Sequence, residues 1–212
     1  VDIEWVDVRE ESIILDRDIN GVIVPGGFGY DGIEGKIEYI KFCRENNIPF
    51  LGICLGMQLA VIEYARNVLD IPNASSAEFE QENTTNIIDL MTEWMSEEGV
   101  RELREKNGNL GGTMRLGDYP AIIKEDTLAH KLYKSTEISE THRHRYEVNI
   151  NYMDLFEDMV FSGMSPDNQL PEIIELTNHP YFIAGQFHPE FKSTPFNPRP
   201  LFLGLVEACL LK

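Results

Sequence analysis

The pattern Gly52-x-Cys54-x-Gly56 places a cysteine between two glycines, directly after a short apolar run and directly before a helix-length pattern. Glycines allow a sharp turn that leaves the central side chain exposed, as in the nucleophile elbow of serine hydrolases. A side chain at such a corner lies at the N-terminus of the following helix, where the partial positive charge favours a thiolate. Cys54 is therefore a candidate nucleophile. The alternative is a structural cysteine buried at the end of a strand.

A cysteine nucleophile needs a histidine as its base and a further group to orient that histidine. His188 ends an apolar run, and Glu190 follows two residues later. If the strands before Cys54 and His188 join one parallel sheet, both side chains emerge at the same edge of that sheet. The residues thus predict a triad of Cys54, His188 and Glu190 for acyl transfer. We assign His130 and His179 to the surface.

A metal site is a second chemistry that these residue types could support. His142 and His144 alternate on one predicted strand, but no third ligand lies at a suitable spacing. The three cysteines lack the spacing of a CxxC site or of a disulfide framework. We therefore expect no metal and a reducing, cytoplasmic setting.

A glycine loop over residues 26–29 precedes a predicted helix. Residues 27–32 fit the G-x-G-x-x-G pattern, but the next strand ends at Cys54 and not at the acid that would hold a ribose. The glycine spacing that follows does not fit a triphosphate-binding loop either. The loop is better placed to complete an oxyanion hole, with the N–H of Leu55 as the other donor.

The hydrophobic pattern predicts an open α/β sheet whose parallel strands have helices on both faces, in one domain over residues 1–212. The first half is predicted to hold strands at 1–8, 22–24 and 50–53 and helices at 33–46 and 55–68. Strands at 145–149, 160–165 and 173–176 are expected to be antiparallel because of their tight spacing, with others at 87–91 and 181–187. Residues 111–117 and 121–123 read as short strands or turns, and 127–134 and 201–211 as helices.

The negative net charge of the chain argues against binding to nucleic acid. A formal net charge of -18 would repel a nucleic-acid backbone. Much of the negative charge lies between residues 78 and 106, which contain nine acidic residues and three basic ones. Such a composition is typical of a solvated surface. No apolar run is long enough for a membrane span, and the N-terminus has no leader pattern. We expect a soluble protein that binds neither nucleic acid nor membrane.

Two motifs together carry a family resemblance. Residues 52–58, GICLGMQ, and residues 188–190, HPE, resemble the class I, or triad, glutamine amidotransferases. Three further segments narrow the resemblance to the glutaminase domains of CTP synthases, namely VPGGFG at 24–29, GGTMRLG at 111–117 and HRHRYEVN at 142–149. Nearly the whole chain fits.

The resemblance implies a flavodoxin-like fold and a reaction. In such domains the cysteine forms a thioester with L-glutamine, which is hydrolysed to glutamate and ammonia. By match to the family's motifs, the glutamine would be contacted by Gly27, Leu55, Gln58, Glu78 and Arg145. The ammonia is destined for amination of UTP to CTP in a synthetase domain, which uses ATP and Mg²⁺, while GTP stimulates the glutaminase.

The chain departs from the family pattern in three ways. We expect the synthetase domain to be absent, and with it the sites for ATP, UTP and Mg²⁺, and we expect the opening strand and helix of the glutaminase domain to be missing. Thr141 stands where the family often has arginine, a change that bears on the GTP response or the domain contact. Two alternatives stay open, a free-standing γ-glutamyl hydrolase and an inactive docking module that depends on a partner.

Overall fold

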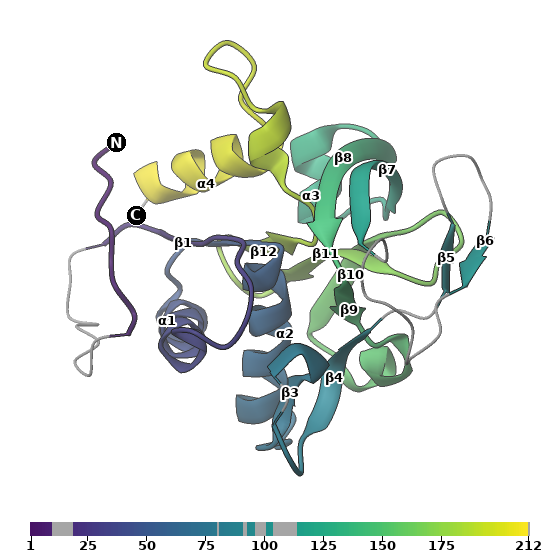
Figure 1. The fold of residues 1–212 in the computed structure, drawn as a ribbon. Helices are drawn as coiled ribbons and strands as arrows, with labels where there is room; N and C mark the ends of the chain where they lie inside the picture. The colour runs from purple at the N-terminus through teal and green to yellow at the C-terminus, as the bar shows by residue number, and fades with distance from the viewer. Residues whose placement is uncertain (10–18, 80, 91–92, 96–100, 104–113, 212) are drawn as a thin grey trace.

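The structure is a computed structural model, and it describes residues 1–9, 19–79, 81–90, 93–95, 101–103 and 114–211. Within these residues, a seven-stranded sheet crosses the molecule in the order β1-β2-β12-β11-β10-β7-β8 (Figure 1). Its strands are β1 (Val22–Val24), β2 (Phe50–Ile53), β12 (Phe182–Gly185), β11 (Pro171–Leu176), β10 (Met159–Met164), β7 (Arg115–Ile123) and β8 (Glu137–His144).

The parallel part of the sheet carries the predicted strand and helix alternation. β2 pairs in parallel with β1 on one side and with β12 on the other. Helix α1 (Ile33–Asn46) follows β1, and helix α2 (Leu55–Asn67) follows β2. The predicted α/β fold is confirmed, and the three parallel strands end at one edge of the sheet.

The other four strands are antiparallel to one another, as the spacing of β10 and β11 predicted. In this part of the sheet, one segment differs from the prediction. The segment expected as separate short strands or turns is the nine-residue strand β7, while residues 111–113 of the prediction lie outside the described part. β7 is continuous because β8 pairs with it along eight residues, from Arg115 opposite His144 to Ile122 opposite Glu137.

Helices cover both faces of the sheet. Along its central strands, successive side chains point to opposite faces. Phe50 and Phe182 pack with α1 and α2 in one hydrophobic core. Leu51 and Ile183 point the other way, into a second core formed with α3 (Leu128–Tyr133) and α4 (Pro200–Leu210). Burial on both faces explains why these strands are almost wholly apolar.

Smaller elements extend the molecule beside α2. β3 (Ala74–Ser76), β4 (Thr85–Leu90) and β9 (Tyr146–Val148) form a three-stranded sheet, and the short helix η1 (Ala77–Phe79) leaves β3. β5 (Glu93–Met95) and β6 (Arg101–Leu103) form an antiparallel pair. The remaining short helices are η2 (Ile150–Leu155) and η3 (Pro189–Lys192).

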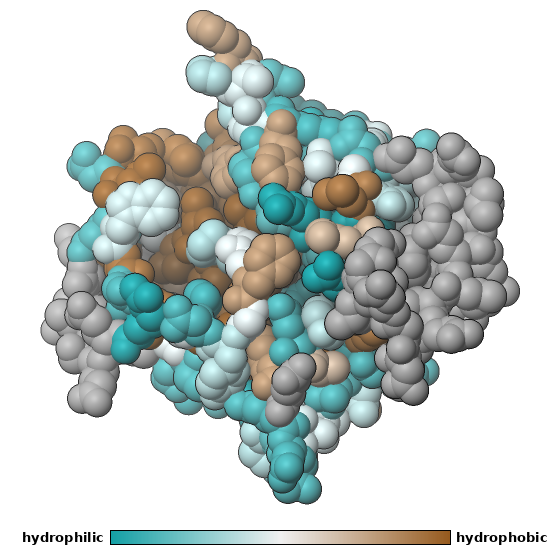
Figure 2. All heavy atoms as spheres, viewed as in Figure 1, coloured by the Kyte–Doolittle hydropathy of each residue, from teal (hydrophilic) through white to brown (hydrophobic). Residues whose placement is uncertain are grey.

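The prediction of a strand over residues 1–8 is wrong. The segment makes no strand pairing with any described residue, and Ile3 and Trp5 are 74% and 88% exposed. Figure 2 shows apolar side chains gathered on the surface on the side where the N-terminus lies in Figure 1. Alternation alone predicted the strand, but alternating residues form one only where a neighbouring backbone accepts their hydrogen bonds.

Candidate active site

Cys54 occupies the predicted elbow between β2 and α2. Its backbone φ of 51° and ψ of -102° put a non-glycine residue in a strained conformation. A Cβ added to Gly56 would lie 2.1 Å from the Val24 carbonyl oxygen, and one added to Gly52 would lie 2.8 Å from the backbone of Gly56. Both glycines are therefore required by close backbone approach, which explains the spacing that revealed the elbow.

His188 and Glu190 come shortly after β12, which ends at Gly185, and Glu190 lies in η3. His188 Nδ1 is 2.7 Å from Glu190 Oε1, and the His188 backbone N–H donates to the Thr141 carbonyl at 2.7 Å. His188 Nε2 is buried and has no hydrogen-bond partner among the described residues. The carboxylate therefore orients the ring and leaves the other nitrogen available for a reacting group.

The glycine loop brings Cys54 and His188 to one place. A Cβ added to Gly26 would lie 2.7 Å from His188 Cε1 and 3.6 Å from Cys54 Cβ. Only a glycine fits there, because the loop backbone lies directly over both side chains. The structure thus places the cysteine, the histidine and the loop at the edge where β1, β2 and β12 end.

The sequence suggested that the helix terminus lowers the pKa of Cys54. In the structure, the pKa of Cys54 is raised overall. The pKa of the Cys54 thiol is raised to about 12, chiefly by burial and also by the charges of Glu147, Glu78 and Glu190. The Leu55 N–H at the start of α2 lowers it. Cys54 is only 3% exposed, so desolvation of the thiolate outweighs the helix terminus.

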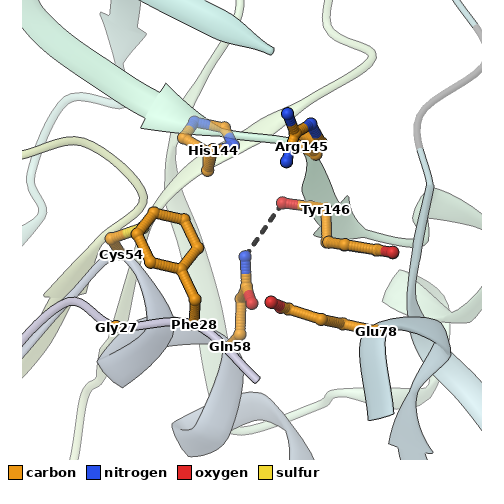
Figure 3. A pocket seen from close by; sticks show the side chains of 8 residues that line it. All are labelled: Gly27, Phe28, Cys54, Gln58, Glu78, His144, Arg145 and Tyr146. Carbon is orange, nitrogen blue, oxygen red and sulfur yellow. Dashed lines mark hydrogen bonds between the residues drawn. The ribbon is translucent and has the colours of Figure 1, made fainter. Parts of the chain in front are cut away.

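A pocket of about 310 Å³, open solvent at its mouth included, lies in front of Cys54. In Figure 3, Cys54, Gln58 and Glu78 lie on one side of this pocket and His144 and Arg145 on the other. Its lining residues are Gly27, Phe28, Cys54, Gln58, Glu78, His144, Arg145 and Tyr146.

Four of the five residues expected to contact glutamine line this pocket, namely Gly27, Gln58, Glu78 and Arg145. Leu55 does not line it. Its buried side chain lies under the loop, where a Cβ added to Gly27 would be 3.1 Å from Leu55 Cδ2, and only its backbone N–H faces Cys54.

Glu78 and Arg145 give the pocket opposite charges. Glu78 reaches it from η1 and accepts a hydrogen bond of 3.0 Å from the Gly29 N–H, which ties it to the glycine loop. Burial raises the pKa of Glu78, while the Gly29 N–H and the Arg145 charge lower it. An acid and a guanidinium in one small pocket suit the two charged ends of a free amino acid.

Polar side chains under the pocket fix its floor. Gln58 Nε2 donates to the Tyr146 carbonyl at 2.9 Å (Figure 3) and lies 3.3 Å from Gln186 Oε1. Gln186 Nε2 in turn lies 3.7 Å from Cys54 Sγ. The residue patterns gave no reason to select Phe28, Tyr146 or Gln186, because the loop and strands that bring them here meet only in the fold.

The other histidines lie outside the predicted triad, and His144 among them lines the pocket. His142 and His144 are buried and contact each other, and no group of acids, histidines and cysteines in the described residues could hold a metal ion. His179 is half-buried rather than on the surface, with Nε2 3.0 Å from the Cys43 carbonyl oxygen. In the part of the chain that the structure describes, no helix is long and apolar enough to cross a membrane.

A family model, "Glutamine amidotransferase class-I", matches residues 1–208. Curated relatives include a CTP synthase from Bartonella tribocorum, 54% identical over 217 residues, and one from Pelagibacter ubique, 55% identical over 210 residues. These alignments cover 99% and 98% of this chain but 40% and 38% of the relatives. The chain thus spans about 40% of the length of the relatives it matches.

Solved structures share the fold. The glutaminase domain of Trypanosoma brucei CTPS, with bound acivicin, superposes with a TM-score of 0.85 at 36% identity, covering 100% of this chain and 81% of the other. A glutamine amidotransferase from Thermotoga maritima gives a TM-score of 0.51 at 14% identity, covering 95% and 80% of the two chains. The second likeness concerns the fold alone.

Proposed function

Because the chain belongs to the class-I glutamine amidotransferase family, we propose that it hydrolyses L-glutamine to glutamate and ammonia, with Cys54, His188 and Glu190 as its catalytic residues. The proposal is supported chiefly by the geometry of the site. The strained elbow cysteine, His188 with its contact to Glu190 and the glycine loop meet at a pocket that has one acidic and one basic wall residue.

Substrate binding uses the two charges of the pocket. Glu78 receives the α-ammonium group and Arg145 the α-carboxylate, which directs the side-chain amide towards Cys54. Gln58 holds the Arg145-Tyr146 segment in place through the Tyr146 carbonyl. Hydrolysis of ordinary peptides is disfavoured, because a peptide bond at the α-amino or α-carboxyl group would remove one of these charges. A γ-glutamyl compound keeps both charges and differs from glutamine only in its larger leaving group.

In the first chemical step, the Cys54 thiol proton passes to His188 as Sγ attacks the amide carbon. The oxyanion that forms is stabilised by the backbone N–H groups of Leu55 and Gly27, each such donor contributing roughly 2.7–4 kcal/mol. The His188 imidazolium, held by Glu190, then gives its proton to the leaving nitrogen. Ammonia departs and a γ-glutamyl thioester remains on Cys54.

In the second step, His188 takes a proton from water, and the resulting hydroxide attacks the thioester carbon. The C–S bond breaks, the sulfur recovers a proton and glutamate leaves. Cys54 must stay reduced to act, which fits the proposed cytoplasmic setting.

The fate of the ammonia belongs to a second domain. We propose that this chain is one glutaminase domain and that its ammonia is used by the synthetase domain of a CTP synthase for ATP-dependent amination of UTP. The support is the naming of the relatives, of which this chain matches about 40%. ATP, UTP, Mg²⁺ and GTP would serve that larger enzyme, and no step in this chain depends on them.

A turnover assay tests the glutaminase proposal. Glutamate release from glutamine is measured for the wild type, for Cys54→Ala and for Cys209→Ala, a matched loss of a thiol from α4. We expect Cys54→Ala to lose turnover by at least about 10³-fold, as is common for removal of a nucleophile. Cys209→Ala should keep it. Unchanged turnover in Cys54→Ala would refute the assignment of the nucleophile.

A further inference from the structure

A buried glutamine, Gln186, lies directly beside the proposed nucleophile. Its side-chain Nε2 is 3.7 Å from Cys54 Sγ, within hydrogen-bonding distance of a sulfur acceptor, and the residue is 0% exposed. Two backbone hydrogen bonds fix this approach. The Cys54 N–H donates to the Gly185 carbonyl at 2.8 Å, and the Gln186 N–H donates to the Glu172 carbonyl at 2.9 Å. The strands of the sheet therefore hold the side-chain amide against the sulfur.

The neighbours of Gln186 decide which of its two amide atoms faces the sulfur. Gln58 Nε2 donates to the Tyr146 carbonyl at 2.9 Å (Figure 3), and a carbonyl can only accept. The same nitrogen is 3.3 Å from Gln186 Oε1 and has a second hydrogen for it. Turning Gln186 over would bring two NH₂ groups together, and turning Gln58 over would bring two carbonyl oxygens together. The hydrogen-bond network therefore assigns an N–H of Gln186 to Sγ.

Negative charge on Sγ needs such a donor. Cys54 is 3% exposed, and burial is the main reason why its pKa is raised, while the Leu55 N–H lowers it. During the reaction, the Leu55 N–H serves the oxyanion of the substrate. Gln186 is not among the residues that line the pocket, so bound glutamine does not reach its amide. The Gln186 N–H therefore stays on the sulfur while the thioester forms and while it breaks.

We propose that Gln186 is a further catalytic residue, whose amide N–H donates to Sγ whenever the sulfur carries negative charge, and that Gln58 positions this amide. Hydrogen bonds to charged groups are stronger than those between neutral groups, so the donor favours the thiolate over the thiol. More thiolate is then available for attack, and the sulfur leaves more readily when the thioester is hydrolysed. This role rests on the proposed function only in taking Cys54 as the nucleophile.

The first test measures the thiol and not glutamine turnover. The rate of Cys54 alkylation at neutral pH, followed by peptide mapping, is compared in the wild type, Gln186→Met and the control Gln169→Met, which replaces an exposed glutamine. Methionine is unbranched like glutamine but has no N–H. We expect the pKa of Cys54 to rise by about one unit in Gln186→Met, so the thiolate fraction falls about tenfold. Because a more basic thiolate is about threefold more reactive, alkylation slows about threefold. Gln169→Met should match the wild type.

Two reagents of different size separate this effect from a change of access. Alkylation by iodoacetamide and by the bulkier N-ethylmaleimide should slow by a similar factor if Gln186→Met changes the thiolate fraction. An altered pocket would change the two rates unequally. Thermal unfolding shows whether the variant is folded. Wild-type alkylation rates in folded Gln186→Met, or a slower reaction with the bulkier reagent alone, would overturn the proposal.

A second variant tests the role of Gln58 and does not depend on the folding of Gln186→Met. Gln58→Met removes the donor that holds Gln186 Oε1, so the amide can turn and alkylation should slow with both reagents. The double variant should react no more slowly than Gln186→Met, because orientation no longer matters once the N–H is gone. If Gln58→Met has no effect, or if the two effects add, Gln58 does not position Gln186 and the proposal is overturned.

These readouts separate the two proposals. If alkylation slows as expected in the variants but the wild type releases no glutamate from glutamine, the glutaminase function fails while the role of Gln186 stands. If glutamine is hydrolysed but alkylation in the folded variants matches the wild type, the reverse holds.

Discussion

Glu78 and Arg145 determine which molecules the pocket accepts, since their charges match the two ends of an amino acid. Replacing Glu78 by Gln leaves a side chain of similar size without the charge. Charge-assisted hydrogen bonds are worth about 1.5–3 kcal/mol, so we expect KM for glutamine to rise roughly tenfold or more, with a smaller loss in kcat. Steady-state kinetics check this, with exposed Glu82→Gln as the control. An unchanged KM would contradict the assignment.

The same residue gives the reaction a pH dependence. The pKa of Glu78 is raised, chiefly by burial, so its carboxylate becomes protonated at a higher pH than that of an exposed glutamate. Since only the charged form holds an ammonium group, KM should increase as the pH falls through this raised value. In Glu78→Gln, this part of the KM profile should be flat.

At the scale of the elements, the elbow depends on glycines more than on its cysteine. Gly56→Ala would push a methyl group to 2.1 Å from the Val24 carbonyl oxygen, so β1 and α2 must move apart. We expect a loss of about 1–3 kcal/mol of stability, as in other overpacked sites, together with a lower rate of Cys54 alkylation. Chemical denaturation and iodoacetamide labelling measure the two effects.

Gly29→Ala is the matched control for this prediction. Gly29 has a φ of 71° but no atom within 4 Å of an added Cβ, so its substitution costs only the backbone strain of about 1–2 kcal/mol. It should leave labelling at Cys54 unchanged. Equal alkylation rates in Gly56→Ala and the wild type would show that the approach of β1 to α2 does not shape the elbow.

The elements were predictable from sequence wherever local pattern and tertiary pairing agree. Helix α1 begins and ends where its periodicity predicted, and the apolar runs of β2 and β12 are strands because both faces are buried. Residues 1–8 show the limit, since their alternation finds no pairing partner among the described residues.

The site was predictable to a similar degree. Cys54, His188 and Glu190 stand out because each lies at or just after the end of an apolar run, where a sheet presents its ligand sites. The hydrogen bonds of Gln58 and Gln186 beneath the pocket could not be predicted in this way. They join helix α2, strand β9 and the residue after β12, which lie far apart in the sequence and approach one another only in the fold.

At the scale of the whole molecule, the chain matches about 40% of the length of its relatives, and the proposed use of its ammonia by a synthetase domain can be tested directly. When the synthetase half of a CTP synthase is supplied with ATP and UTP, we expect glutamate release to rise and CTP to form from glutamine. Cys54→Ala should abolish CTP formation from glutamine but not from added ammonium. A lack of any rise under all nucleotide conditions would favour an inactive docking module.

The central claim is that glutamine is hydrolysed through a thioester on Cys54. Its most direct test is acid quenching of the wild-type enzyme during turnover, followed by peptide mapping by mass spectrometry. The account predicts a γ-glutamyl adduct on the peptide that contains Cys54, absent in Cys54→Ala and present in Cys209→Ala. Continued turnover with an adduct on another residue would contradict it.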